Sequence, residues 1–414
     1  MSKEQRNVPK LRFPEFTGEW IQHMLSDEFS DFIVPMRDKP KEFGGTIPWT
    51  RIEDIEGKYL NGTLSDQYVT EETIKKMNLR IIPKDSLIVS SSATFGIVAV
   101  VTQDLITNQT FIGLVPNEKS TLDFWYSYFQ SDGARAYMKL QSAGSTIFYI
   151  ARESFEKMPV RIPPKAEAIR IGALFANVDT LIALQQRKLD QSKEYKKGML
   201  QKMFPKEGKS VPEVRFPGFT GEWERRKLGD VLEDLYNGQT PSRVQTSYWN
   251  GDINWLTSGE LNRGIVYTCI ERITKKGQES AHLKIIPRGT FVMAITGLEA
   301  SGTRGNCAIL GIDTTLNQSC MALMPDPSLL STRFLFQWYK MVGEEYGTRF
   351  TQGTKQQSYN AEIIKSLDIV LPSVKEQEQI SDVLVNLDTL ISLHQRKLEA
   401  MKEYKKGLLQ QMFV

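Results

Sequence analysis

Sequence motifs typical of catalytic sites are scarce in this chain of 414 residues. It has no GxxxxGK(S/T) phosphate-binding loop, no GxGxxG fingerprint after an expected strand, and no Asn-Pro-Pro-(Phe/Tyr) tetrapeptide of the kind found in base-amino methyltransferases. Its three histidines, His23, His282 and His394, are too far apart in sequence for an HExxH zinc site. Glycine-rich residues 301–306 precede no helix start, which favours a turn between strands. We therefore expect no catalytic residue and no metal site.

Hydrogen-bonding side chains gather instead in segments expected to be loops. Asn and Gln can pair bidentately with adenine, Arg with guanine, and hydroxyl groups with either base. Singly the candidates are weak, because most loop Ser, Thr and Asn side chains satisfy turns. The candidates for base contact are Arg51, Ser91, Ser92, Thr94, Ser145, Thr146 and Tyr149 in the first half, and Thr257, Ser258, Arg263, Thr296, Arg304, Asn306, Gln352, Lys355, Gln356 and Gln357 in the second.

The elements that must position these loops occur twice. Residues 178–204 and 387–413 agree at 19 of 27 positions with an offset of 209, and residues 8–20 and 211–223 agree at ten of 13 with an offset of 203. Between them only islands match, such as "LRIIPK" with "LKIIPR", and Trp49 with Trp255. The sequence thus predicts two copies of one unit, each with a short arm, a variable body and a long helix.

Each body mixes strand and helix signals. Runs such as "DSLIVSSS" and "GTFVMAIT" are rich in β-formers and bounded by turn residues, and aromatic runs such as "STRFLFQWYKMVGEEY" predict helices packed on the sheets. The fold class is α+β, with two mixed α/β bodies in tandem. We place the first arm and body at 1–163, the central helix at 164–206, the second arm and body at 207–372 and the last helix at 373–414.

Both long helices carry an apolar seam with a 4,3 spacing. Its apolar members include Val178, Ile182, Leu189 and Met199 in the first helix, and Leu387, Ile391, Leu398 and Leu408 in the second. Leu181, Leu184, Leu390 and Leu393 are expected to widen this stripe, and His394 in the seam is expected to pack rather than to catalyse. We predict that the helices pair as an antiparallel coiled coil with pseudo-twofold symmetry. A Ser373–Glu376 capping box should start the second helix.

Charge, cysteine content and hydropathy limit the classes of protein that fit. The net charge is +3, to which residues 178–204 contribute 6 − 3 = +3 and residues 387–413 contribute 5 − 3 = +2, so the rest sums to −2. Three cysteines without a CxxC pair fit a reducing compartment. Neither a signal peptide nor about 18 consecutive apolar residues occurs, so we expect a cytoplasmic protein without membrane contact.

The repeated "VPKLRFPEFTGEW" and "LIxLxQRKLxxxKEYKKGxLQxMF" signatures resemble the specificity subunits of type I restriction–modification enzymes over essentially the whole chain. The resemblance implies that each body is a target recognition domain that reads one half of a split, asymmetric site in double-stranded DNA. It also implies two modification (methyltransferase) subunits docked on the long helices, and restriction (translocase/endonuclease) subunits. S-adenosylmethionine, ATP and Mg²⁺ would then belong to the partner subunits, with no cofactor in this chain.

Two other classes of protein stay open on the residues alone. A single chain that itself modifies DNA would need several hundred further residues with a cofactor fold. A coiled-coil scaffold that presents two bodies to ligands other than DNA fits the nearly neutral bodies, because DNA readers usually carry a basic footprint. Copurification with a methyltransferase subunit would distinguish these alternatives from the specificity subunit.

Overall fold

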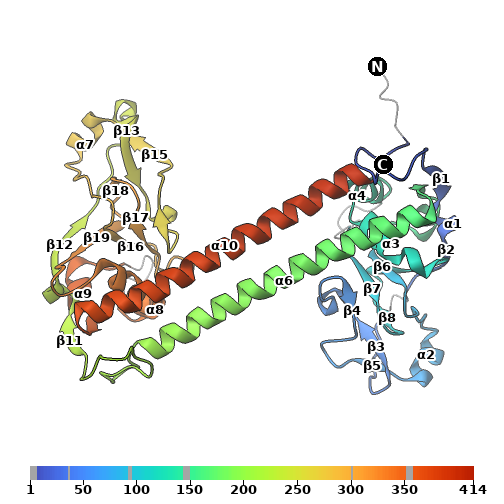
Figure 1. Cartoon of the computed structure of the whole chain (residues 1–414), viewed down its shortest axis with the longest axis horizontal. Coiled ribbons are helices and arrows are strands. Elements are labelled where there is room, and N and C mark those ends of the chain that lie inside the picture. The colour runs from blue at the N-terminus through green and yellow to red at the C-terminus, as the bar shows by residue number, and fades with distance from the viewer. Residues whose placement is uncertain (1–6, 36–37, 92–95, 143–149, 300–301, 351–357) are drawn as a thin grey trace. The chain divides into compact units, whose positions relative to one another are not determined.

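The structure, a computed structural model, describes residues 7–35, 38–91, 96–142, 150–299, 302–350 and 358–414. It forms two compact units: unit 1 comprises Met1–Leu189 and Leu393–Val414, and unit 2 comprises Asp190–Ser392. Each unit holds one body, the start of the long helix that follows this body, and the end of the other long helix (Figure 1). Among the residues described, no helix is long and apolar enough to cross a membrane.

The first body is built on a five-stranded sheet with the strand order β2-β9-β6-β7-β4 and a three-stranded sheet with the order β5-β3-β8. The strands are β2 (Phe29–Ile33), β9 (Phe111–Pro116), β6 (Leu87–Ser90), β7 (Val98–Val101), β4 (Tyr59–Leu60), β5 (Tyr68–Val69), β3 (Ile47–Thr50) and β8 (Ile106–Thr107). A separate antiparallel pair joins β1 (Ile21–Met24) to β10 (Pro159–Ile162). The helices are α1 (Leu25–Glu28), α2 (Glu71–Met77), α3 (Leu122–Phe129), α4 (Asp132–Leu140) and α5 (Arg152–Glu156).

The second body repeats these sheets as β12-β19-β16-β17-β14 and β15-β13-β18. Its strands are β12 (Leu232–Asn237), β19 (Cys320–Pro325), β16 (Phe291–Ala294), β17 (Cys307–Leu310), β14 (Ile265–Val266), β15 (Glu271–Ile273), β13 (Trp249–Leu256) and β18 (Thr315–Leu316), with the pair β11 (Glu224–Lys227) and β20 (Asp368–Leu371). Its helices are α7 (Lys275–Ser280), α8 (Thr332–Arg349) and α9 (Ala361–Ser366). In Figure 1, α8 and α9 lie beside the long helix, and β13, β15 and α7 form a lobe away from it.

The two bodies share their register as well as their strand order. Ile33 pairs with Gly113 in the first body, and Tyr236 pairs with Ala322 in the second, one residue before the end of β12. A β-bulge interrupts both pairings at the same place. Trp49 and Trp255 occupy equivalent places in the three-stranded sheets, and each is 2% exposed. The predicted tandem of two α+β bodies is therefore confirmed.

The long helices are α6 (Lys165–Met203) and α10 (Val374–Met412). The capping box expected at the start of α10 forms only in part. The Glu376 amide donates to the Ser373 hydroxyl over 3.4 Å, but the Glu376 carboxylate binds Arg215 of the arm and not the backbone of Ser373. A partner 161 residues away in sequence thus overrides the local capping pattern.

The core of each body is completed by the end of the helix that follows the other body. In unit 1, Leu408 and Met412 of α10 belong to the buried cluster of the first body, and the Phe413 ring lies 5.5 Å from that of Phe124. In unit 2, Met203 of α6 belongs to the cluster of the second body, and the Phe204 ring lies 5.1 Å from that of Phe334. The Met-Phe end of each helix is thus a core element of the opposite body.

Candidate nucleic-acid interface

Two of the base-contact candidates of the first body lie among the residues that the structure describes. The backbone amide of Arg51 binds the Asp54 carboxylate at 2.7 Å, and its guanidinium donates to the Ser65 hydroxyl at 3.2 Å. Ser91 is 6% exposed and donates its hydroxyl proton to the Thr110 carbonyl. The Arg51 side chain is partly exposed, whereas the Ser91 side chain is buried and its hydroxyl is bonded to the backbone. Ser92, Thr94, Ser145, Thr146 and Tyr149 lie outside the described residues.

Three candidates of the second body form one cluster. The Arg263 guanidinium donates to the Asn306 side-chain oxygen at 3.3 Å and to the Arg304 carbonyl at 2.6 Å. Arg304 in turn donates to the Leu298 carbonyl at 2.7 Å. These bonds hold the turn between β16 and β17, the turn that the glycine pattern predicted, so the three side chains have a structural role there.

The other described candidates of the second body lie in or beside turns. The Thr257 amide and hydroxyl both donate to the Glu260 carboxylate, which fixes the turn that contains half-buried Ser258. Thr296 forms an isolated bridge with Ser358, just past β16. Gln352, Lys355, Gln356 and Gln357 lie outside the described residues. Thr296 directly precedes Gly297 and Leu298, whose carbonyls accept from Thr303 and Arg304, so it lies near the cluster of Arg263, Arg304 and Asn306.

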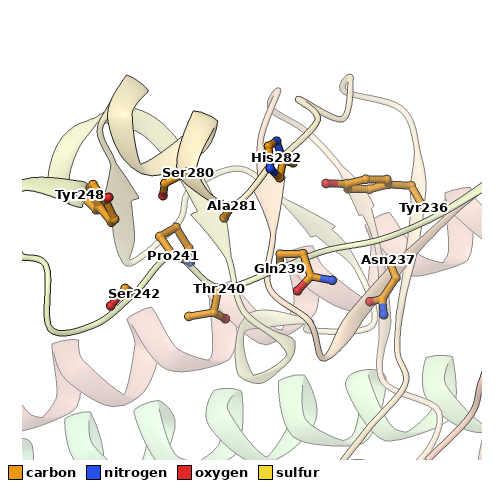
Figure 2. A pocket seen from close by; sticks show the side chains of 10 residues that line it. All are labelled: Tyr236, Asn237, Gln239, Thr240, Pro241, Ser242, Tyr248, Ser280, Ala281 and His282. Atoms are coloured by element: carbon orange, nitrogen blue, oxygen red, sulfur yellow. The ribbon is translucent and has the colours of Figure 1, made fainter.

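A pocket in the second body gathers residues that the sequence reasoning missed. Its volume is about 680 Å³, and its lining includes Tyr236, Asn237, Gln239, Tyr248 and His282 (Figure 2). Tyr236 and Asn237 end β12, and His282 follows α7, so the pocket lies between the end of a strand and the end of a short helix. The matching island "LKIIPR", which starts directly after His282, was the signal that could have located it.

The arm of each repeat is held to its own long helix by a buried ion pair. In unit 1 the Arg12 guanidinium donates to both carboxylate oxygens of Glu167 at 2.7 Å, and the Glu167 side chain is fully buried. In unit 2 Arg215 binds Glu376 in the same fork, at 2.7 and 2.8 Å. Hydrogen bonds to the carboxylate raise the pKa of each arginine above its ordinary value. Both arms are thus fixed by charge-assisted bidentate bonds.

The eight predicted apolar seam residues are all buried or half-buried, and polar pairs stand between them. Gln185 donates from its amide nitrogen to the His394 carbonyl at 3.1 Å and lies 2.9 Å from the His394 ring nitrogen. Lys405 binds Asp179 at 2.6 Å in unit 1, and Lys196 binds Asp388 at the same distance in unit 2. These pairings run antiparallel in both units.

The two seam ion pairs differ in the further side chain that each body contributes. In unit 1 the neutral side chain of Gln130 accepts from Lys405, whereas in unit 2 a second cation, Lys340, binds Asp388 at 3.1 Å. Burial, and then repulsion by Lys340, lower the pKa of Lys196 to about 8 against the opposing attraction of Asp388. Burial alone would raise the pKa of Asp388, but both lysines outweigh it and hold that pKa below its ordinary value.

The leucines expected to widen the seam point elsewhere, so this expectation was wrong. Leu181, Leu184, Leu390 and Leu393 are 55%, 50%, 41% and 55% exposed. Each repeats at the offset of 209, as do exposed Tyr195 and Tyr404. Apolar side chains thus stay exposed at matching places on both long helices.

Comparison with known proteins identifies relatives along nearly the whole chain. A family model described as "Type I restriction modification DNA specificity domain" matches residues 35–194 and again 220–403. The MjaIX type I restriction enzyme specificity subunit of Methanocaldococcus jannaschii is 21% identical over 390 residues, which is 90% of this chain and 87% of that protein. The EcoR124I/EcoR124II specificity subunit of Escherichia coli is 26% identical over 176 residues, which is 41% of this chain and 42% of that protein.

Solved structures show the same fold. The type I restriction–modification S subunit from M. genitalium superposes with a TM-score of 0.63 at 13% identity and covers 98% of this chain and 99% of its own. A chain from a study of complex assembly and conformational transition of a type I system gives a TM-score of 0.56 at 16% identity, with 95% of this chain and 97% of the other covered. Both likenesses extend over both bodies and both long helices.

Proposed function

Because this chain belongs to the family of type I restriction–modification specificity subunits, we propose that it reads a bipartite, asymmetric site in double-stranded DNA, one half with each body. The observation that carries the proposal is the duplication itself. The two bodies share strand order, register and a bulge, yet between the arms and helices their sequences agree only in islands. A common frame with different surfaces is what two readers of different half-sites need.

The long helices are proposed to dock two methyltransferase subunits, one on each copy of the exposed apolar face. Leu181 and Leu184 on α6, and Leu390 and Leu393 on α10, are at least 41% exposed although they are large and apolar. A solvated helix would carry polar side chains there. Two copies of one face fit two copies of one partner.

The chemistry is proposed to reside on the partners. S-adenosylmethionine would be bound by the methyltransferase subunits, and ATP and Mg²⁺ by restriction subunits, while this chain contributes base recognition and the assembly surface. Its own candidate residues for base contact are those that the sequence suggested, of which Arg51 is half-buried and Arg263 is exposed, together with the pocket of the second body.

Reconstitution tests the proposal. The purified chain alone should neither transfer methyl groups to DNA nor hydrolyse ATP. When the methyltransferase subunit encoded with it is added, adenine methylation should appear at a site with two specified halves and an unspecified gap, as mapped by sequencing of modified bases. Turnover by the lone chain, or methylation at a single uninterrupted site, would contradict the proposal.

A further inference from the structure

We propose that the pocket between β12 and α7 takes the edges of one or two base pairs of the half-site read by the second body, with Asn237, Gln239 and His282 as specificity-determining residues. This inference rests on the proposed function, because it assigns a part of the DNA to a named part of the second body. Figure 2 shows Tyr236, Asn237 and His282 toward one end of the pocket and Tyr248 toward the other.

The walls of the pocket are fixed by bonds to the body. The Tyr236 hydroxyl accepts a hydrogen bond from the Lys284 amide at 2.9 Å, which holds its ring in place. The backbone N–H of Gln239 donates to the Leu316 carbonyl, and the backbone carbonyl of Gln239 accepts from the Trp255 indole, both at 3.0 Å. Gly238 allows the backbone to approach Leu316 this closely, because a Cβ on residue 238 would lie 2.1 Å from the Leu316 oxygen. The pocket is therefore held in shape before any ligand arrives.

The side chains that face the pocket keep unused hydrogen-bonding capacity. Asn237 and Gln239 are exposed, and within the described structure their side-chain amide groups have no hydrogen-bond partner. His282 is also exposed and brings two ring nitrogens. Side-chain amides pair bidentately with adenine, and aromatic rings offer apolar contact beside them. Among the described residues of the lining none is acidic, so no carboxylate opposes a polyanion there.

The first body retains the frame of this pocket but not its lining. His282 and Asn78 both adopt the left-handed conformation, with φ of 51° and 50°, directly before a buried leucine. Lys284 pairs with Asp234 at 3.7 Å, as Arg80 pairs with Asp31 at 2.9 Å. Both bodies thus place an ion pair between the strand and the residue two positions after the shared left-handed turn.

The lining residues are those that differ. The register places Ile33 where Tyr236 stands and Val34 where Asn237 stands, and the turn places Asn78 where His282 stands. Val34 is 44% exposed although it is apolar. A pocket needed only for folding would keep its lining along with its frame. Change confined to the lining is expected where two bodies read different bases.

The test exchanges the lining for that of the first body without changing the frame. The variant combines Asn237→Val and His282→Asn, which the first body shows to be compatible with the fold, with Gln239→Ala. The full chain is assembled with its methyltransferase subunit, and methylated sites are mapped on a DNA library randomised in both halves. We expect discrimination at one or two positions of the second half-site to fall about 5- to 140-fold, the range of one bidentate base contact.

The matched control makes the reverse exchange in the first body, Val34→Asn with Asn78→His. It should alter the first half-site and leave the second unchanged. A second-body variant that keeps both half-site preferences overturns the inference, and so does one that weakens methylation of every sequence alike, because that pattern indicates contact with the DNA backbone. A wild-type complex that methylates no bipartite site overturns the proposed function instead, and so does methyl transfer by the chain alone.

Discussion

The buried ion pair between Arg215 and Glu376 gives a prediction for which the other repeat serves as an internal control. We expect Arg215→Ala to destabilise unit 2 and to leave unit 1 unchanged. The substitution removes a forked pair of bonds at 2.7 and 2.8 Å and leaves the Glu376 carboxylate, whose side chain is 1% exposed, without its cation. It also removes the bond from Arg215 to the Gly221 carbonyl, which ties the arm into its turn.

The magnitude follows from the burial of the two partners. Removing one partner of a buried ion pair costs about 3–5 kcal/mol. Glu376 lies in the first turn of α10, where the helix dipole favours its charge by about 0.3–1 kcal/mol, and 16% of the Arg215 side chain already reaches solvent. We therefore expect a loss of about 2–3 kcal/mol in the free energy of opening. Local opening should become about 30- to 140-fold more frequent.

Hydrogen exchange followed by mass spectrometry measures this unit by unit. The amides in the first turns of α10 should exchange faster by that factor, while those of α6 near Glu167 keep their wild-type rates. Arg12→Ala should instead accelerate exchange in the first turns of α6 and leave those of α10 at their wild-type rates. Arg333→Ala is the surface control, because its pair with Asp382 is about half exposed on both sides and is expected to contribute about 0–1 kcal/mol. If Arg215→Ala accelerates exchange no more than Arg333→Ala, the reasoning about the buried pair is wrong.

Three further predictions concern the long helices. Leu181→Asp combined with Leu390→Asp should weaken binding of the methyltransferase subunit at least tenfold in a titration, without changing the preferred half-sites. Four residues inserted after both Gln185 and His394 should lengthen each helix by about 6 Å, and site mapping should then find a gap longer by one or two base pairs with the same half-sites. The wild type should also gain stability relative to Lys196→Met as the pH rises. The difference in free energy of unfolding should grow by about 2–3 kcal/mol between pH 8 and 10.5. Over that range the unfolded chain still holds the lysine proton, whereas the folded chain has released it. Chemical denaturation at several pH values measures this difference, and a flat difference would show that Lys196 is not desolvated.

The sequence predicted the elements that depend on local periodicity and those that occur in both copies of the repeat. The long helices follow from a 4,3 spacing that persists for several turns, and the equivalence of Trp49 and Trp255 follows from alignment of the two copies. These features depend on local pattern and on duplication, both of which are visible in a single sequence. Side chains at seam positions, such as Leu189 and Leu398, are each 1% exposed.

The failures share a physical cause, which is competition from contacts that residue type and spacing do not reveal. Glu376 has the spacing of a capping box, but Arg215 offers its carboxylate a stronger, charge-assisted partner. Leu181 continues an apolar stripe, but the seam is already filled and the side chain is left outside. The loop candidates for base contact were chosen by residue type alone, and type does not reveal that Arg304 is held by the Leu298 carbonyl.

The exchange of helix ends explains why the helices stayed alike while the bodies diverged. Asp179 of α6 meets the first body and Lys405, whereas Met203 at the other end of the same helix fills the core of the second body. Each helix must therefore fit both bodies and the other helix at once, so a change in one copy must suit three partners. A residue such as Tyr236, which lines the pocket of the second body, need only suit its own body and what the pocket binds. The pattern of identity along the chain thus separates the residues that assemble the protein from those that can vary with its target.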